Sequence, residues 1–285
     1  MIPVPMETVL VTGASSGIGR ATARRFASAG WRVYAVDIDA DGLGDLDGCE
    51  TTTLDVTDGA AIGRLYERIR TEAGGLDCVV ANAGYCQPGP LEDLPAERVE
   101  RQFAVNVQGT LGTITAGLPL LRERGGSAVV VSSTHGRVVT PGMGAYAGSK
   151  HAIEGMADAL RIEVAGGSVD VTLVAPAWVD TGFSAESDRH LSGFERSARY
   201  ADVYDALEGG ALLGGGPLAV TPDRVAATIH DAATAETPAA RYPVGLPARL
   251  VLATRWLPRP VQDLGQRVSI RMLAALERVR GAITE

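Results

Sequence analysis

The chain has 285 residues, of which 46% are apolar, 5% aromatic and 21% charged, and it contains 35 glycines. It is long enough to bury a full hydrophobic core, and its composition excludes the disordered and fibrous classes of protein. The net charge of −8 argues against nucleic acid or an anionic membrane surface as the main partner, because the long-range field repels phosphate groups.

The N-terminal stretch and the cysteines bear on the cell compartment. The stretch MIPVPMETVLVTG has no basic region followed by a small-residue cleavage site, and no apolar run reaches about 18 residues. Cys49, Cys78 and Cys86 are an odd number and lack metal-ligand spacing, which favours a reducing compartment and predicts no metal site. We therefore expect a soluble cytoplasmic protein without a membrane span.

Short apolar runs alternate with helical patterns along the first 180 residues. The apolar runs are TVLVTG, RVYAVD, TTTLDV, LDCVVANAG, SAVVVSS and VDVTLVAP. Strands that alternate with helices in this way form right-handed βαβ units on a parallel sheet. The pattern predicts an α/β protein: one doubly wound domain of the Rossmann type over residues 1–285.

The alternation breaks after Thr181. Residues 182–220 mix charged, aromatic and glycine-rich pieces, and we expect them to form a substrate lid over the carboxyl edge of the sheet. Thr221 and Pro222 are typical of a helix start. A short strand, ARYPVG, should precede a helical C-terminal extension over residues 246–285, whose apolar stripes are as typical of core or subunit interface as of a substrate wall.

The segment TGASSGIG follows the first strand and opens the first helix. Gly13, Gly17 and Gly19 would let backbone amides approach a pyrophosphate, and the helix N-terminus adds positive potential. Ordinary packing is the alternative explanation of these glycines. Their place directly after a strand favours a dinucleotide site.

Asp37 ends the second strand, 18 residues after Gly19, where a carboxylate can accept hydrogen bonds from both adenosine ribose hydroxyls. A 2′-phosphate there would meet a like charge, at a cost of about 1 to 4 kcal/mol. Ser15, Ser16 and Ile38 provide no basic group to offset that repulsion. The sequence therefore predicts NAD in preference to NADP, although Asp37 could also be a simple turn residue.

Lys150 is the only lysine in the chain, beside twenty-five arginines. It follows Tyr146 by four residues, so in a helix the two side chains share one face. The ammonium is a compact point charge that a planar guanidinium does not replace, and beside a phenol it lowers the phenol pKa. An accidental neighbour is the alternative, but the pair suggests a tyrosine that exchanges protons.

Together these motifs resemble the short-chain dehydrogenase/reductase family over residues 8 to about 245. The elements that carry the resemblance are TGxxxGxG, ANAG at 81–84, Asn106 in VNVQG, Ser133 in VVVSS, YxxxK at Tyr146 and Lys150, and PAWVDT at 176–181. Ala81 and Ala177 depart from the usual pattern without removing a catalytic group. The tail RYPVGLPARLVLATRWLPRPVQD is similar to the branch related to 17β-hydroxysteroid and retinol dehydrogenases.

The resemblance implies a catalytic tetrad of Asn106, Ser133, Tyr146 and Lys150. Tyr146 would be the general acid/base, with Lys150 lowering its pKa and reaching the nicotinamide ribose. Ser133 would donate a hydrogen bond to the substrate oxygen, and Asn106 would hold a water at the far end of a proton relay. The resemblance further places cofactor contacts at Gly13, Ser15, Ser16, Gly17, Ile18, Gly19, Asp37, Asp55, Val56, Asn82, Ala83, Gly84, Tyr146, Lys150, Pro176, Val179 and Thr181.

Residues around the tetrad are candidates for the substrate pocket. They are Tyr85, Ser133, His135, Met143, Trp178 and Phe183, and apart from Ser133 each of them could equally serve packing. The branch suggests an apolar alcohol or ketone of medium to large size. Small residues on the helices near 104–123 and after Tyr146 suggest a homodimer or homotetramer.

The sequence thus predicts an NAD-dependent enzyme that interconverts a secondary alcohol and a ketone by hydride transfer. A catalytically silent NAD(H)-binding regulator would keep the same fold, and the complete tetrad argues against it. An epimerase or dehydratase of the same family would use the same tyrosine and lysine, but such enzymes usually carry a GxxGxxG turn.

Overall fold

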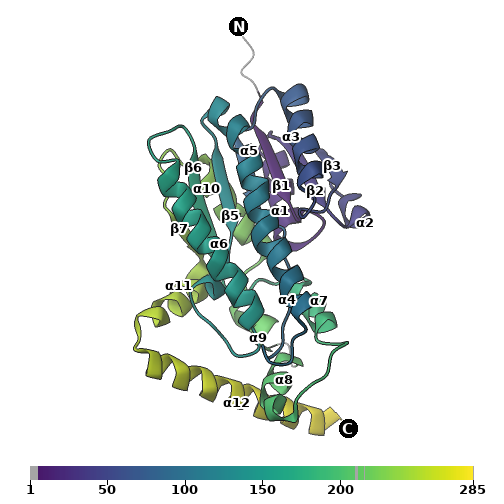
Figure 1. The fold of residues 1–285 in the computed structure, drawn as a ribbon, viewed down its shortest axis with the longest axis vertical. Coiled ribbons are helices and arrows are strands. Elements are labelled where there is room, and N and C mark those ends of the chain that lie inside the picture. Colours follow the sequence, from purple (N-terminus) through teal and green to yellow (C-terminus); the bar gives the residue numbers. More distant parts are fainter. Residues whose placement is uncertain (1–5, 209–210, 215, 285) are drawn as a thin grey trace.

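The computed structural model describes residues 6–208, 211–214 and 216–284, and its centre is a parallel sheet (Figure 1). Its seven strands in these residues lie in the order β3-β2-β1-β4-β5-β6-β7. They are β1 (Thr8–Thr12), β2 (Arg32–Asp37), β3 (Cys49–Thr53), β4 (Cys78–Ala81), β5 (Ser127–Val131), β6 (Asp170–Pro176) and β7 (Arg241–Val244). Each predicted apolar run is a strand, and all the pairs are parallel, so the predicted doubly wound fold is confirmed.

Strand β1 pairs with both β2 and β4, so the strand order reverses beside it. Val9 lies opposite Val33 of β2 on one side and Cys78 of β4 on the other. In such sheets the chains leaving the carboxyl ends of the two neighbouring strands separate and open a crevice. The reversal therefore predicts a ligand site beyond Thr12.

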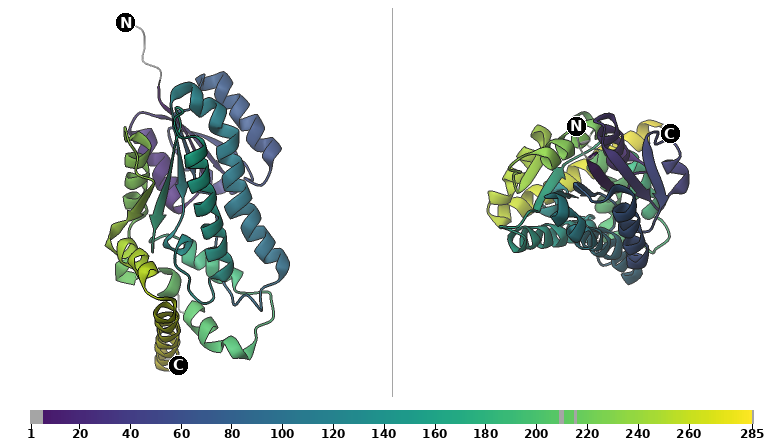
Figure 2. Two further views of the ribbon diagram at one scale, coloured as in Figure 1. Left: turned by 60° about the vertical axis from the view of Figure 1, so that its left-hand side comes forward. Right: turned by 90° about the horizontal axis from the view of Figure 1, so that it is seen from above.

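Helices cover both faces of the sheet (Figure 2). On one face are α1 (Gly17–Ser28) and α10 (Pro222–Thr234), which pack on strand side chains such as Val9 and Val33. Helices α3 (Gly59–Ala73), α5 (Thr110–Arg124) and α6 (Gly144–Glu163) cover the other face. Because successive strand residues point to opposite faces, Leu10 belongs to this second layer.

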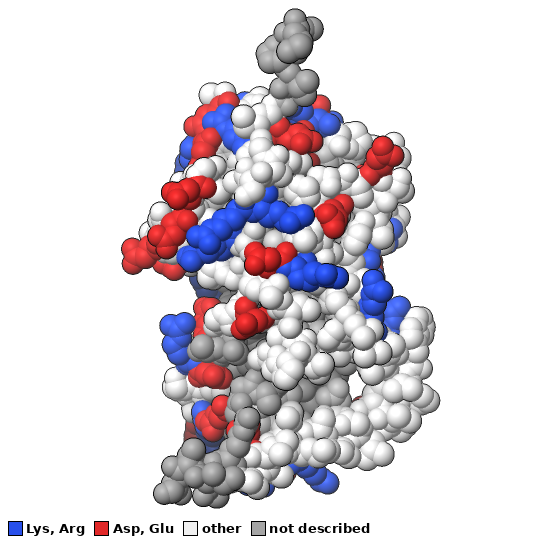
Figure 3. Space-filling view, turned by 180° about the vertical axis from the view of Figure 1, so that it is seen from behind, with Lys and Arg blue, Asp and Glu red and all other residues white. Residues whose placement is uncertain are grey.

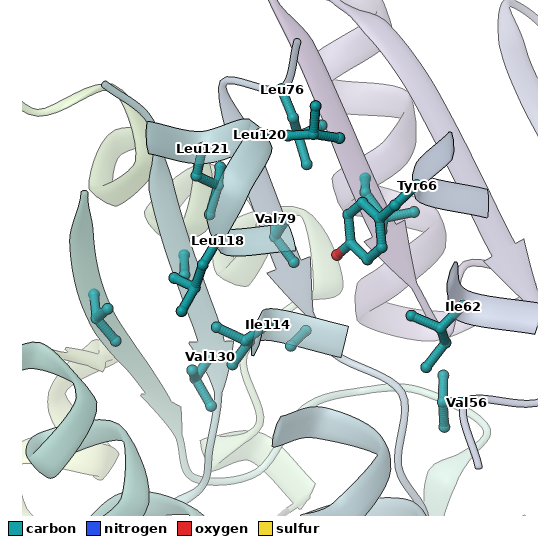
Figure 4. Packing of buried hydrophobic residues seen from close by; sticks show 14 of the residues in the cluster. Val56, Ile62, Tyr66, Leu76, Val79, Ile114, Leu118, Leu120, Leu121 and Val130 are labelled. Atoms are coloured by element: carbon teal, nitrogen blue, oxygen red, sulfur yellow. The ribbon is translucent and has the colours of Figure 1, made fainter. Parts of the chain in front are cut away.

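The layer under α3 and α5 is the larger apolar cluster (Figure 4). Tyr66 belongs to this cluster together with Leu118, Ile114 and Val79, and its hydroxyl donates to the Thr113 carbonyl at 2.6 Å. A buried hydroxyl without a partner would be costly, so this bond allows a tyrosine in the core.

Several short helices and turns lie between the strands and the longer helices of the protein. They are α2 (Ala40–Leu43), α4 (Ala96–Phe103), the π-helical turn Ala104–Gly109 and the 3₁₀ turn Thr134–Gly136. The segment expected to form a lid contains α7 (Phe183–His190), the 3₁₀ turn Ala198–Tyr200, α8 (Ala201–Glu208), α9 (Ala211–Gly214) and the 3₁₀ turn Gly216–Leu218. Gly209, Gly210 and Gly215 of its glycine-rich piece lie outside the described residues.

A small third core joins this lid segment to the body of the protein. Leu191, Tyr204 and Leu207 of the segment pack with Cys86, Met143 and Tyr146. The lid segment therefore packs directly against Tyr146, the predicted catalytic tyrosine. Beyond it, the Thr221 hydroxyl accepts from the Arg224 amide with Pro222 at the first helical position, as predicted for the start of α10.

The C-terminal extension consists of α11 (Gly245–Ala253), the 3₁₀ turn Thr254–Trp256 and α12 (Arg259–Thr284). Figure 1 shows α12 crossing the end of the molecule beside α8. The Arg278 guanidinium pairs with Asp202 and, at 2.8 Å, with Asp205 of α8. None of the described helices combines the length and the apolar character that crossing a bilayer requires.

Candidate active site

A cavity of about 1080 Å³ opens beyond the carboxyl ends of the strands. It extends from the glycine-rich turn after β1, past Asp37 and Lys150, to the lid segment at Phe183 and Leu212. Of the predicted site residues, only Gly19 and Asn106 do not line it. One cavity therefore gathers predicted site residues that are up to 170 positions apart in the sequence.

The glycine-rich turn needs its glycines for two different reasons. Gly13 and Gly17 have φ angles of 70° and 50°, in the left-handed region that side chains disfavour. A Cβ at Gly19 would lie 1.8 Å from the Gly13 carbonyl oxygen. Gly19 thus lies behind the turn and lets α1 begin close to it, whereas Gly13 and Gly17 face the cavity.

Asn82 and Thr181 hold the turn from two sides. The Asn82 amide donates to the carbonyls of Thr12, at 2.9 Å, and Gly13, at 3.2 Å. A Cβ at Gly17 would lie 3.2 Å from the Thr181 methyl group, so Thr181 covers the start of α1. No side chain caps this helix N-terminus, and its amides adjoin the cavity, where they can receive an anion.

The Asp37 carboxylate lies at the cavity wall next to this turn. It accepts from the Ser15 amide at 2.9 Å and from the Asp39 amide at 3.0 Å. These two bonds fix the carboxylate and leave further lone pairs for hydroxyl donors. The nearby Arg20 is already bound to the Gly42 carbonyl at 2.8 Å, and Ile38 is exposed.

Tyr146 and Lys150 lie one turn apart on α6, as their spacing predicts, and both are buried. The Lys150 ammonium is 5.8 Å from the centre of the Tyr146 ring and donates to the Val131 carbonyl at 2.9 Å. Rings of His135 and Phe183 lie 5.7 and 5.9 Å from the tyrosine ring. The Tyr146 ring therefore has two aromatic neighbours at the cavity wall.

Burial dominates the titration of these groups. It raises the pKa of Tyr146, which the Cys86 thiolate form raises further and a hydrogen bond with Ser133 lowers. Burial also lowers the pKa of Lys150, to about 8, against the opposing charge of Glu154. Loss of hydration is thus the largest influence on the pKa of both groups in the chain without cofactor.

Ser133 and His135 follow β5 at the cavity wall. The Ser133 hydroxyl accepts from the His135 amide at 3.2 Å and donates to the phenol oxygen of Tyr146, which lowers the pKa of Tyr146. Burial lowers the pKa of His135 to about 4, so its ring is neutral near pH 7. His135 therefore contributes shape and an aromatic contact to the pocket rather than charge.

Asn106 lies on the π-helical turn and is buried away from the cavity. Its Oδ1 accepts from the Tyr85 amide at 3.0 Å, and its Nδ2 donates to the Tyr85 carbonyl at 2.9 Å and to the Ser149 hydroxyl at 3.1 Å. Both amide protons are used, so only the second lone pair of Oδ1 is left for a water. The side chain ties the segment after β4 to α6.

Two groups of charged residues at the site were not anticipated from the sequence. Buried Glu154, one turn after Lys150, pairs with Arg137 at 2.8 Å and with Arg241. At the cavity rim, Arg98 donates to the His190 carbonyl at 2.8 Å and Arg101 to Asp55 at 3.1 Å. No local motif marks these arginines, because their partners come from distant segments.

Comparison with known proteins finds related sequences over most of the chain. A family model described as "short chain dehydrogenase" matches residues 7–192. "Probable short-chain type dehydrogenase/reductase VdlC" of Helicobacter pylori is 34% identical over 251 residues, which are 86% of this chain and 90% of that protein. The "3-ketodihydrosphingosine reductase" of Bacteroides thetaiotaomicron is 33% identical and covers 70% of this chain and 73% of its own.

Solved structures agree with the sequence relatives. A short-chain dehydrogenase from Streptomyces avermitilis, 28% identical, has a TM-score of 0.76 and covers 99% of this chain and 100% of its own. A short-chain dehydrogenase/reductase from Burkholderia phymatum in complex with NAD, 26% identical, has a TM-score of 0.75 over 93% of this chain and 97% of its own. The fold, the motifs and these relatives together show that the chain belongs to the short-chain dehydrogenase/reductase family.

Proposed function

We propose that this oxidoreductase interconverts a secondary alcohol and a ketone with NAD, and that Tyr146 is its general acid/base. One observation carries the proposal. Tyr146, Ser133 and Lys150 line the same cavity as the glycine-rich turn and Asp37, so proton transfer and dinucleotide binding share one space. The complete tetrad also favours an enzyme over a silent NAD(H)-binding regulator.

The residues present fit a dinucleotide. The turn at Gly13 and Gly17 with the start of α1 would hold the pyrophosphate, and Asp37 would accept from the adenosine ribose. Lys150 would donate to the nicotinamide ribose. Further predicted contacts line the same cavity, among them Asn82, Ala83, Gly84, Pro176, Val179 and Thr181. Bound there, the nicotinamide group supplies or accepts the hydride.

Each side chain of the tetrad then has a separate task. Ser133 donates to the substrate oxygen and fixes it beside Tyr146, whose hydroxyl gives a proton to that oxygen in reduction and takes one in oxidation. The buried positive charge of Lys150 favours the phenolate form when the proton leaves. Asn106 holds the backbone after β4 in register with α6, so that the wall carrying these groups stays fixed.

The substrate proposed is apolar and of medium to large size. Met143, Trp178 and Phe183 line the lid side of the cavity, with Leu212 beyond them. Trp178 is fixed there because its indole donates to the Leu212 carbonyl at 2.8 Å. Among the relatives, the names "3-ketodihydrosphingosine reductase" and "D-beta-hydroxybutyrate dehydrogenase" give different substrates, so the lining of the pocket carries this part of the proposal.

A graded substrate panel tests this proposal. We expect the purified protein to form NADH at alkaline pH with secondary alcohols, at rates that rise from short aliphatic to steroid-sized compounds. Absorbance at the NADH band gives the rate, and samples without alcohol are the blank. No turnover with any member, together with normal NADH binding, would favour the silent regulator instead.

The proposed preference for NAD rests on Asp37, since similar structures include complexes with NAD and complexes with NADP-type cofactors, such as a serine dehydrogenase with NADP+. We expect Asp37→Ala to raise Kd for NAD and to lower the ratio of NADP Kd to NAD Kd by roughly tenfold, because the like charge facing a 2′-phosphate is removed. Titration of protein fluorescence with each cofactor measures both constants. An unchanged ratio would refute the role of Asp37.

A homodimer or homotetramer in a reducing cytoplasm completes the proposal. Gly112 on α5 and Gly155 on α6 have open space where a Cβ would point, which permits close approach of a second copy. Gly109, in contrast, packs against Val56 of its own chain. The three cysteines are unpaired thiols, as a reducing compartment allows.

A further inference from the structure

The helix α12 carries a continuous apolar stripe on its exposed side. The stripe consists of Val261, Leu264, Val268, Met272, Leu276 and Val279, each between 46% and 63% exposed. Successive members are three or four residues apart, so all six lie on one face of the helix over five turns. An exposed apolar face of this length is typical of an interaction surface.

The contacts on the opposite side of α12 determine which way this stripe faces. Ile270 and Ala274 are buried where the helix packs against α8 of the lid segment. Arg278 anchors the same contact through Asp202 and Asp205. Because the inner face is already occupied by α8, the stripe points away from the described body of the protein.

The apolar surface continues onto the neighbouring elements. Leu246 and Leu250 of α11 are 66% and 61% exposed, and Trp256 in the following 3₁₀ turn is 77% exposed. The Arg255 guanidinium lies 4.5 Å from the centre of the indole. Figure 3 shows a broad area without charged residues at the lower right, where α11 and the start of α12 lie. Exposed tryptophan beside arginine is typical of side chains at a membrane interface.

The charge of this extension is opposite to that of the rest of the chain. Residues 246–285 contain seven arginines and three carboxylates, a net charge of +4, whereas residues 1–245 carry a net −12. Arg267 and Arg271 are exposed and directly precede Val268 and Met272, so they flank the stripe along one side. The average charge, which argued against an anionic surface, therefore conceals a basic segment.

We propose that the extension, meaning α11, the turn Thr254–Trp256 and α12, docks the protein on an anionic lipid surface. The stripe and Trp256 enter the interface between headgroups and acyl chains, while the flanking arginines pair with lipid phosphates. Charge complementarity selects this occupant. A second copy packed against the same face would bring two segments of net +4 together.

Docking in this way places the lid segment next to the lipid. The α12 contact with α8 joins the docked helix to the segment that rests on Tyr146 and Met143. An apolar alcohol or ketone dissolved in the bilayer would then be concentrated beside the cavity. This consequence rests on the proposed function, whereas the docking itself does not.

Vesicle flotation of the full-length protein tests the proposal. We expect binding to vesicles of phosphatidylcholine mixed with phosphatidylglycerol, at least roughly tenfold tighter than to phosphatidylcholine alone, and weaker binding as salt rises. Val268→Glu with Met272→Glu should abolish it. The charge-matched pair Gln266→Glu with Ser269→Glu, on the same helix but outside the apolar stripe, should retain most of it.

Two results would overturn the proposal. One is equal or absent binding to the two vesicle types. The other is that the unaltered protein does not bind vesicles, while light scattering shows that the Val268 and Met272 substitutions lower the molecular mass of the protein in solution. The stripe would then be covered by a second copy. Flotation requires no turnover, and NADH formation from a water-soluble alcohol, measured in parallel, reports separately on the proposed function.

Discussion

The Tyr146→Phe variant should fold and bind cofactor normally, yet lose turnover by roughly a hundredfold to ten-thousandfold. The substitution removes one hydroxyl and keeps the ring, so the contacts with His135 and Phe183 remain. Without the hydroxyl, the substrate oxygen has no partner that both gives and takes a proton. Initial rates of NADH formation, together with NADH titration by fluorescence, separate the loss of chemistry from a loss of binding.

Tyr34→Phe is the matched control for that loss. Its hydroxyl donates to Glu72 at 2.9 Å from strand β2, and the residue does not line the cavity. The control loses a hydroxyl of the same kind and should keep full turnover. If Tyr146→Phe retained rates near those of this control, another group would have to be the acid/base, and the proposed mechanism would fail.

The second large effect is expected for Lys150→Arg, which keeps the positive charge. Lys150 is buried, and its ammonium reaches the Val131 carbonyl at 2.9 Å. The planar guanidinium is larger and differently directed, so it should displace its neighbours by about 1 Å, which alone can cost roughly a hundredfold in rate. Steady-state kinetics give kcat/KM, and thermal unfolding reports the overpacking.

Lys150→Met provides the comparison without charge. Both variants should be nearly inactive, and the methionine variant should be at least as stable as the arginine variant because it places no charge in the buried site. If the arginine variant turned over at close to the normal rate, a positive charge of any shape would suffice. Catalysis would then not explain why position 150 holds lysine rather than arginine.

The order of strands and helices along the chain could be predicted because it follows from local sequence patterns. Runs such as TVLVTG and SAVVVSS are buried on both faces, and in a parallel sheet that requires nearly continuous apolar residues. Since the carboxyl ends of parallel strands meet at one edge, placing Asp37 and Ser133 at strand ends was sufficient to bring them to the same cavity.

Other features of the site depend on contacts between distant segments. Glu154 is buried because Arg137 and Arg241 reach it from a loop and from β7, and nothing near Glu154 in the sequence indicates that. The amide of Asn106 also donates both its protons to distant segments, to the Tyr85 carbonyl and the Ser149 hydroxyl, which its place in VNVQG does not indicate. Likewise, the apolar stripe of α12 could have been core, and only the packing of α8 decides which side is exposed.

The position of Lys150 also determines how the protein reacts with reagents and enzymes that modify lysine amines. Its ε-amine is the only one in these 285 residues, and it is buried in the cavity rather than displayed on the surface. Acetylation, ubiquitin transfer and amine-directed cross-linking therefore have no lysine target on the outside of the folded protein. Any reagent that modifies a lysine here reports on the opening of the cavity itself.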